Sequence, residues 1–383
     1  MAPPEAGLAT PVKLVLSDDW ELRGDGSGNM RAIQFSTIRR LCDIYEAHGL
    51  RGSFNVEVFQ QLVHLRLRDS NPELVALSQE WEEVVRETYQ RGHDVQLHLH
   101  PQWSAATYSG GRWRLGASWA LTDYTRSQLS GMLGEAKAYL ESLLRPSNPD
   151  YRCQSFRAGS WAIAPSPYLL EVLAELGIVF DMSIANGLFY DSPEVRIDYR
   201  QVEEPFLPFY PRLDDARRVA SSRQPIVCVP THTFRPRRRG RLMHSLAGRL
   251  LDAPLPRRIY RSHLAAGDTP VRDGGYRADY GDRTRQSVSE QPATGVTVSD
   301  LGCLTFAQMR EALDDIRRRA AATGWSEVPV ILENHSKDLG DFAPIERFAR
   351  LVESTQDIAT IKASELADGL RSGRYPARTA DAA

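Results

Sequence analysis

Two histidines stand two residues apart in the apolar stretch "GHDVQLHLHPQW" (92–103). In a strand, residues two apart point to the same side, so His98 and His100 share one face while Leu97 and Leu99 share the other. Two neutral imidazoles at this spacing suit a chelated zinc ion or a similar metal. One or both histidines could instead be buried or surface residues with ordinary partners. The spacing at a strand end, before a proline, favours the metal site.

A pair of adjacent aspartates, Asp18 and Asp19, ends the first apolar run in "LSDDWE" (16–21). Neighbouring carboxylates at a buried strand end repel each other unless positive charge lies beside them. One of the two can bind a cation while the other accepts a proton from water. Alone, the pair is also typical of a helix cap or a turn. Together with the two histidines, it predicts a metal site of two histidines and one carboxylate.

An arginine, Arg157, ends another short run in "SFRAGSW" (155–161). It could orient a carboxylate by a bidentate bond, or form an ordinary salt bridge at the rim of the fold. The backbone N–H groups around residues 159–161 could serve as an oxyanion hole. Ser160 and Trp161 are therefore expected to contact substrate.

A further histidine, His335, follows a very apolar run in "ILENHSKDL". Beside a metal site, an imidazole is a natural general acid for a departing amine. Asp181, in "VFDMSI", is expected to hold this imidazole or to pair with Arg157; the alternatives are a buried structural aspartate and a rim histidine. His232, in "VPTHTF", and Trp103 are expected to line the substrate pocket rather than to bind metal.

The elements that must position these residues are short apolar runs that alternate with helical stretches. Strands are expected at about 12–17, 52–58, 94–100, 153–158, 178–184, 225–232, 328–335 and from 357. This alternation is typical of an α/β fold with a parallel sheet. Seven or eight units predict a distorted TIM-like (β/α) barrel with seven or eight parallel strands. The candidate residues then meet at the carboxyl ends of the strands, where barrel active sites form.

Composition and length agree with one such domain over 1–383. The chain has 42% hydrophobic and 25% charged residues and a net charge of -2, which is ordinary for a globular protein and gives no sign of nucleic-acid binding. The first residues lack the pattern of a secretory leader, and no apolar run has the length of a membrane span. These features predict a cytoplasmic protein without a transmembrane segment.

One segment, at about 233–300, breaks the pattern because it is rich in arginine between Arg235 and Arg261. We interpret it as an insertion that contains a short amphipathic helix near 241–251. Such a charge run is usually a solvated face. Near the mouth of a barrel, it could instead meet a phosphate-bearing or lipid-linked substrate, or make peripheral contact with an anionic membrane surface.

Taken in order, the motifs resemble those of the polysaccharide deacetylase (NodB-homology, carbohydrate esterase) superfamily. "LSDDWE" is similar to the first motif, "GHDVQLHLHP" to the second, and "FRAGSW", "DMSI" and "ENHSKDL" to the arginine, aspartate and histidine motifs. The resemblance implies that Asp18 is the base and that Asp19, His98 and His100 bind the metal. It also implies that Arg157 orients Asp18, and that Asp181 orients the acid His335.

The resemblance further implies a distorted barrel, one divalent ion (zinc, or cobalt, nickel, manganese or iron) and hydrolysis of a non-peptide amide. The expected reaction removes an N-acyl group, with N-acetyl on an amino sugar or glycan-like substrate as first choice. The family separates its two histidine ligands by three residues, which would place the second at Gln102. Either a shortened loop still delivers His100, or metal binding is altered. The alternatives are a deformylase, a cyclic-amide hydrolase, or an inactive barrel that binds glycans or lipid headgroups.

Overall fold

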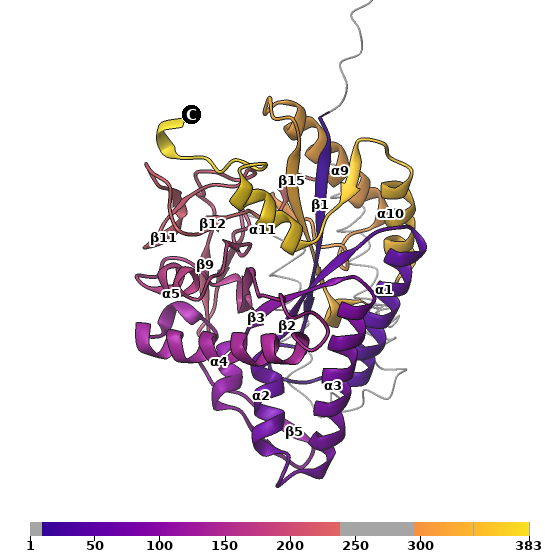
Figure 1. Ribbon diagram of the computed structural model, residues 1–383, viewed down its shortest axis with the longest axis vertical. Coiled ribbons are helices and arrows are strands. Elements are labelled where there is room, and N and C mark those ends of the chain that lie inside the picture. The colour runs from indigo at the N-terminus through magenta and orange to yellow at the C-terminus, as the bar shows by residue number, and fades with distance from the viewer. Residues whose placement is uncertain (1–9, 238–294, 340, 383) are drawn as a thin grey trace, which may run out of the picture.

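The structure is a computed structural model that describes residues 10–237, 295–339 and 341–382 (Figure 1). Its centre is one sheet in which all strand pairs are parallel, in the order β12-β7-β6-β3-β2-β1-β15, with β16 paired to the start of β1. The strands are β1 (Val12–Trp20), β2 (Gly52–Glu57), β3 (Asp94–Leu99), β6 (Ser155–Ala158), β7 (Phe180–Asp181), β12 (Val227–Cys228), β15 (Val328–His335) and β16 (Ile358–Thr360).

The sheet curls so far that its two ends meet. Beyond β12, Thr231 forms a parallel bridge with Ile331 of β15, and the His232 N–H donates to the carbonyl of the same Ile331. Strands lie at all the positions expected from the sequence, so the prediction of a distorted barrel is confirmed. Several of them are shorter than expected, β7 and β12 above all, because most of each predicted run is irregular chain.

Helices follow most of the strands and surround the curled sheet (Figure 1). They are α1 (Thr37–Ala47), α2 (Val58–Leu67), α3 (Pro72–Gln90), α4 (Arg126–Leu144), α5 (Leu169–Glu175), α9 (Phe306–Ala321), α10 (Ala343–Glu353) and α11 (Ala363–Ser372). Capping boxes of threonine and glutamine begin α4 and α9, with Thr125 and Thr305 as the capping residues. None of the helices in the described ranges is long and apolar enough to cross a membrane.

Side chains of the strands alternate between two separate cores, as the period of a strand requires. In β1, Leu14 and Leu16 join the large cluster that the surrounding helices cover. Val15 belongs instead to a smaller cluster inside the barrel, together with Ile331 of β15 and Leu366 of α11. This division decides which later residues of each strand point inward, and thus which reach the mouth of the barrel.

Among the described residues, four antiparallel pairs of strands lie outside the barrel sheet. They are β4 (Thr107–Ser109) with β5 (Arg112–Arg114), β8 (Phe189–Asp191) with β9 (Arg196–Asp198), β10 (Pro211–Arg212) with β11 (Asp215–Val219), and β13 (Thr233–Phe234) with β14 (Thr297–Val298). The last pair brings the two ends of the arginine-rich segment together. The expected helix near 241–251, and the arginines beyond Arg237, lie outside the described residues.

A histidine buried away from the barrel mouth makes stability depend on pH. His64 of α2 is stacked on Trp113, with ring centroids 5.2 Å apart, and neither of its ring nitrogens has a hydrogen-bond partner among the described residues. Burial lowers the pKa of His64 from 6.5 to about 3, because the charged ring would lose its hydration. Between these two values only the unfolded chain takes up the proton, so this histidine destabilises the folded protein as pH falls.

We expect His64→Phe to remove this loss, because phenylalanine keeps the stacking and leaves no buried nitrogen unpaired. Urea unfolding of both proteins at pH 7 and pH 5 measures the effect. When the pH is lowered from 7 to 5, the free energy of unfolding should fall by about 2 kcal/mol less in the variant than in the wild type. Parallel curves at the two pH values would contradict the assignment.

Candidate active site

The inward-pointing residues at the carboxyl ends of the strands are polar and gather around one cavity. Asp19 of β1 and Glu21, the first residue after that strand, both line the cavity, as the strand period predicts for residues two apart. The cavity is lined by Asp19, Glu21, Gly24, His98, His100, Trp119, Ala158, Ser160, Trp161, Leu188, Tyr190, Val195, Ile197, His335, Lys337 and Asp338. It lies where the barrel prediction places an active site.

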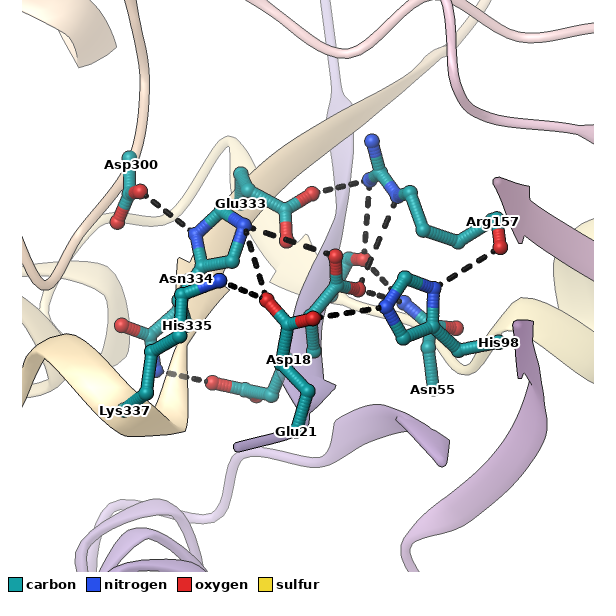
Figure 2. Close-up of polar contacts among 12 residues, drawn as sticks. Asp18, Glu21, Asn55, His98, Arg157, Asp300, Glu333, Asn334, His335 and Lys337 are labelled. Atoms are coloured by element: carbon teal, nitrogen blue, oxygen red, sulfur yellow. Dashed lines mark hydrogen bonds and ion pairs between the residues drawn. The ribbon is translucent and has the colours of Figure 1, made fainter. Parts of the chain in front are cut away.

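Glu21, His98 and His100 form a buried cluster at the floor of this cavity. One ligand atom of each lies within 4.8 Å of the others. The His98 Nε2 atom is 3.3 Å from Glu21 Oε2, and the His100 Nε2 atom forms an ion pair with the same oxygen (Figure 2 shows Glu21 and His98). The two histidines of the H-x-H motif therefore do converge, although only one residue separates them.

Backbone contacts fix both imidazoles in place. The Nδ1 atom of His98 is 2.9 Å from the carbonyl of Arg157, and since a carbonyl only accepts, Nδ1 carries the proton and Nε2 faces Glu21. The N–H of His100 donates to the carboxyl of Glu57 at the end of β2. His100 is followed by Pro101, which opens a short 3-10 turn and so ends the strand at this point.

The side chain of Gln102 supports the ring of His100 from the other side. Its Nε2 atom is 3.0 Å from His100 Nδ1, while its buried Oε1 atom has no partner among the described residues. If the amide of Gln102 is turned by 180°, its Oε1 atom accepts a hydrogen bond from a protonated Nδ1 of His100. The turn breaks only the long hydrogen bond of 3.4 Å from Gln102 Nε2 to the carbonyl of Gly24. The Nε2 atom of His100 then carries no proton and can bind a metal ion.

The carboxylate of Glu21 is held from both ends. Its Oε2 atom faces the histidines, and its Oε1 atom forms an ion pair with Lys337 (Figure 2). Burial alone would raise the pKa of Glu21, but the charges of Lys337 and His100 hold it well below its usual range. Burial opposes a charge on His98 as well, yet the carboxylates of Asp19 and Glu21 raise the pKa of His98 to about 9.

The donor set of Glu21, His98 and His100 fits a divalent ion. Two imidazoles and one carboxylate with an open cavity in front are the ligands of a catalytic zinc site. Two other acidic clusters lie nearby, Asp19–Glu333–His335 and Asp300–Cys303–Asp338. The first of these has one imidazole and its Glu333 is paired with Arg157, and the second has no imidazole, so neither offers the two histidines of the Glu21 cluster.

Asp19 lies beside this cluster and points into the cavity. Its Oδ1 atom accepts a hydrogen bond of 2.8 Å from Asn55, and the Arg157 Nε atom is 3.8 Å away. Burial by itself would raise the pKa of Asp19, but the charges of His98, Arg157 and His335 outweigh it and lower the pKa. An ionised carboxylate at this place is an acceptor for a proton from the cavity.

Asp18 points the other way, as neighbouring residues of a strand do, and it does not line the cavity. Its carboxyl accepts hydrogen bonds from Tyr45 of α1 at 3.1 Å and from Asn334 at 2.5 Å (Figure 2 shows the latter). Burial raises the pKa of Asp18 to about 7, although these two bonds oppose the rise. The position between sheet and helix corrects the expectation that Arg157 orients Asp18, since Arg157 contacts Asp19 instead.

Arg157 is fully buried and forms an ion pair with Glu333 of β15 (Figure 2). The side chain also lies over the ring of Trp161, with its guanidinium carbon 4.3 Å from the ring centroid. It therefore connects three parts of the site, the first strand through Asp19, the last strand through Glu333, and the turn that follows β6.

His335 is held by a carboxylate that the sequence did not indicate. Its Nδ1 atom is 2.8 Å from Oδ2 of Asp300, a residue that was expected in the insertion (Figure 2). The Asp300 charge raises the pKa of His335 against the effect of burial. Asp181, the predicted partner, instead accepts bonds from the N–H and hydroxyl of Ser183. The expectation that Asp181 holds His335 is therefore corrected.

The turn at Gly159–Trp161 has an unusual backbone. Ser160 and Trp161 have positive φ angles of 53° and 61°, a conformation that costs about 1–3 kcal/mol for such residues. The hydroxyl of Tyr199 donates to the Trp161 carbonyl and helps to hold the turn. A Cβ atom on Gly159 would come within 2.5 Å of the Leu99 carbonyl and 2.8 Å of the His100 ring, so only glycine permits this close approach.

Two predicted substrate contacts lie elsewhere. His232 is buried against Ser299 and Asp315, 2.7 and 3.2 Å from its ring nitrogens, and it does not line the cavity. Trp103 is buried edge-on against Trp113 and is likewise absent from the lining. The structure contradicts the placement of both, whereas Ser160 and Trp161 do line the cavity as expected.

Comparison with known proteins supports the architecture. Searches against family models and against curated proteins found no match. Among solved structures, a protein from Mycobacterium smegmatis described as a candidate polysaccharide deacetylase matches with a TM-score of 0.50 and 14% identity over 99% of this chain and 96% of that chain.

Two further structures match with lower scores. A candidate polysaccharide deacetylase from Pseudomonas aeruginosa PAO1 has a TM-score of 0.47 and 12% identity, covering 95% of this chain and 92% of that one. The Puue allantoinase has a TM-score of 0.46 and 12% identity, covering 96% and 92%. The likeness to the mycobacterial structure shows that this chain has the barrel fold of polysaccharide deacetylase-like proteins, as its sequence motifs predict.

Proposed function

We propose that this protein is a metal-dependent hydrolase that removes an N-acyl group from a non-peptide amide. The observation that carries the proposal is the cluster of Glu21, His98 and His100 at the floor of the cavity, with Asp19 and His335 beside it. The description of the mycobacterial structure as a candidate polysaccharide deacetylase agrees with this reaction class.

Glu21, His98 and His100 would hold one divalent ion, with zinc the first choice and cobalt, nickel, manganese and iron as alternatives. Such an ion polarises a bound amide carbonyl and lowers the pKa of water in the site. This assignment revises the ligand set expected from the sequence, because Glu21 takes the place proposed for Asp19. Lys337 then orients the second oxygen of the Glu21 carboxylate.

Two side chains of the cavity would move protons. Asp19, ionised and free to face the cavity, accepts the proton of the attacking water in place of Asp18. His335, held by Asp300, donates a proton to the departing amine. The Asp19 Oδ2 and His335 Nε2 atoms are 3.7 Å apart, so a base and an acid stand on the same side of the proposed ion.

The turn after β6 would stabilise the charge that develops on the amide oxygen. Ser160 and Trp161 line the cavity in the left-handed conformation described above, and their backbone N–H groups would be the donors. Fixed N–H donors at such a place stabilise an oxyanion without reorganisation during the reaction. Arg157, behind Trp161, positions Asp19 rather than touching the substrate.

The first experiment combines metal analysis with a search for product. The purified chain is stripped with a chelator, reloaded separately with the five candidate ions, and analysed for bound metal. Each form is then incubated with N-acetylglucosamine and other N-acetylated, N-formylated and cyclic amides. We expect about one ion per chain and release of a free amine that depends on this ion.

The acid that is released separates the reactions within this class. Acetate indicates a deacetylase, formate a deformylase, and a ring-opened product a cyclic-amide hydrolase. A chain that binds no ion after reloading, or a loaded chain that hydrolyses none of these amides, would overturn the proposal and favour a barrel that only binds its ligand.

A further inference from the structure

The wall of the cavity above the polar floor is made almost entirely of hydrocarbon. Besides Gly24 and Ser160, it consists of Trp119, Ala158, Trp161, Leu188, Tyr190, Val195 and Ile197. Four of these, Ala158, Leu188, Val195 and Ile197, are aliphatic and offer no hydrogen-bond donor or acceptor in their side chains. An apolar wall of this kind is what a hydrocarbon group needs and what a hydroxyl group does not.

Four of the wall residues, Leu188, Tyr190, Val195 and Ile197, belong to one segment, "LFYDSPEVRIDY" (188–199). Tyr190 lies in β8 and Ile197 in β9, and the two strands form an antiparallel hairpin. The end of the segment is tied to the site, because the Tyr199 hydroxyl donates to the carbonyl of Trp161. The hairpin is therefore held against the turn that carries the proposed oxyanion donors.

Two of the polar groups at the floor already have charged partners. Glu21 pairs with Lys337, and His335 pairs with Asp300. A sugar ring pressed into the cavity would lose hydrogen bonds to water and find few replacements along the aliphatic wall. The amide itself, in contrast, would meet its polar partners at the floor.

The size of the cavity also exceeds what an acetyl group requires. The cavity has a volume of about 120 Å³. A cavity needs roughly 10–15 Å³ to hold one water molecule, so this space admits several heavy atoms beyond those of an acetyl group. A group of several carbon atoms would fill the part beside the hairpin that an acetyl group leaves to water.

We infer that the scissile amide carries a hydrocarbon group of several carbons, aliphatic or aromatic, which packs against the β8–β9 hairpin. This inference rests on the proposed amide hydrolysis and names the substrate class of the same site. It distinguishes the cavity from one that is built to receive an unsubstituted N-acetyl amino sugar.

The test is a pair of substrate series on the metal-loaded enzyme. In one series a single amine carries an acetyl, butyryl, hexanoyl or benzoyl group; in the other, N-acetylbenzylamine is compared with N-acetylglucosamine. Each methylene group that becomes buried should raise kcat/KM roughly fourfold, so we expect at least a tenfold rise in one of the series. Hydrolysis with no rise in either series would overturn the inference and leave the proposed function standing.

A polar substitution in the hairpin tests the location. Ile197→Asn should reduce the preference for the larger group at least tenfold. Leu213→Asn is the matched control, since Leu213 is a partly buried residue that packs on the core outside the cavity, and it should leave the preference unchanged. Equal effects of the two changes would contradict the assignment of the wall.

A binding measurement covers the cases in which the variant does not fold or no amide is cleaved. The melting temperature of the wild type is measured with N-acetylbenzylamine and with N-acetylglucosamine at equal concentrations. We expect a shift with the benzyl compound alone. A shift without hydrolysis of any amide would remove the proposed function but keep the apolar binding site, and a shift with the sugar alone would overturn the inference.

Discussion

Replacing Asp19 by asparagine is expected to lower kcat by roughly 10²–10⁴-fold, the range that a general base contributes. Asparagine has nearly the same shape, and its carbonyl oxygen still accepts the hydrogen bond from Asn55. An amide does not take up a proton, however, so the proposed step from water is lost. Because Asp19 is outside the proposed ligand cluster, the metal content of the variant should match that of the wild type.

Asp18→Asn is the control, since the two aspartates are neighbours in one strand and equally buried. Its side chain faces Tyr45 and Asn334, both of which remain able to donate to an asparagine carbonyl. We expect kcat to stay within a few-fold of the wild type, with any effect seen in thermal stability. If Asp18→Asn were the more damaging change, the motif-based assignment of the base would be right and the argument from side-chain direction wrong.

The contrast between these aspartates shows how far sequence reasoning reached. The strands were predictable because each is a short apolar run, and the two histidines because H-x-H places both rings on one face. The motif comparison, however, assigned the base by its order in the chain. Whether Asp18 or Asp19 faces the cavity depends on the phase of the strand, which the cores at Leu16 and Val15 reveal.

The same periodicity could have indicated Glu21 and Glu333. Glu21 is two residues beyond Asp19, and Glu333 is two residues before His335, so each shares a face with a residue that the sequence had already singled out. Both stand in the quoted stretches "LSDDWE" and "ENHSKDL", but they were overlooked because the resemblance assigns a role to neither of them. Extending the H-x-H argument to every strand would have found the third member of the cluster.

Asp300 was beyond such reasoning. It follows a long segment of unusual composition and reaches His335 only because β14 pairs with β13 and returns the chain to the barrel. The role expected for Asp181 was wrong for a related reason. The strand β7 ends at Asp181 after two residues, and the carboxylate of Asp181 accepts a hydrogen bond from Ser183 in the bend that follows. His232 does not reach the cavity either, because its ring nitrogen contacts Asp315 of α9.

The second large effect concerns the residue that binds the metal. Glu21→Gln should weaken zinc binding by more than the roughly 10–100-fold that the loss of an outer-shell partner costs, and activity should fall with it. The amide is similar in size but carries no charge, and it is a poor ligand beside two imidazoles. Titration of the metal-free protein against a coloured chelator measures the affinity directly.

Glu333→Gln is the matched comparison, because Glu333 belongs to the neighbouring cluster with Asp19 and His335. Burial raises the pKa of Glu333 although Arg157 lies beside it, and glutamine keeps the size of this side chain while leaving Glu21, His98 and His100 unchanged. We expect this variant to keep its zinc affinity. The reverse result, with zinc lost in Glu333→Gln and kept in Glu21→Gln, would move the ion to the other cluster and make Asp19 a ligand rather than a base.

Stability must be separated from binding in this comparison, because Glu21→Gln leaves Lys337 buried without its partner. Breaking one side of a buried ion pair is strongly destabilising. The double variant Glu21→Gln, Lys337→Met removes the unpaired charge and should recover thermal stability without recovering zinc affinity. If zinc binding returned together with stability, Glu21 would act by holding the fold and the two histidines would bind the ion without it.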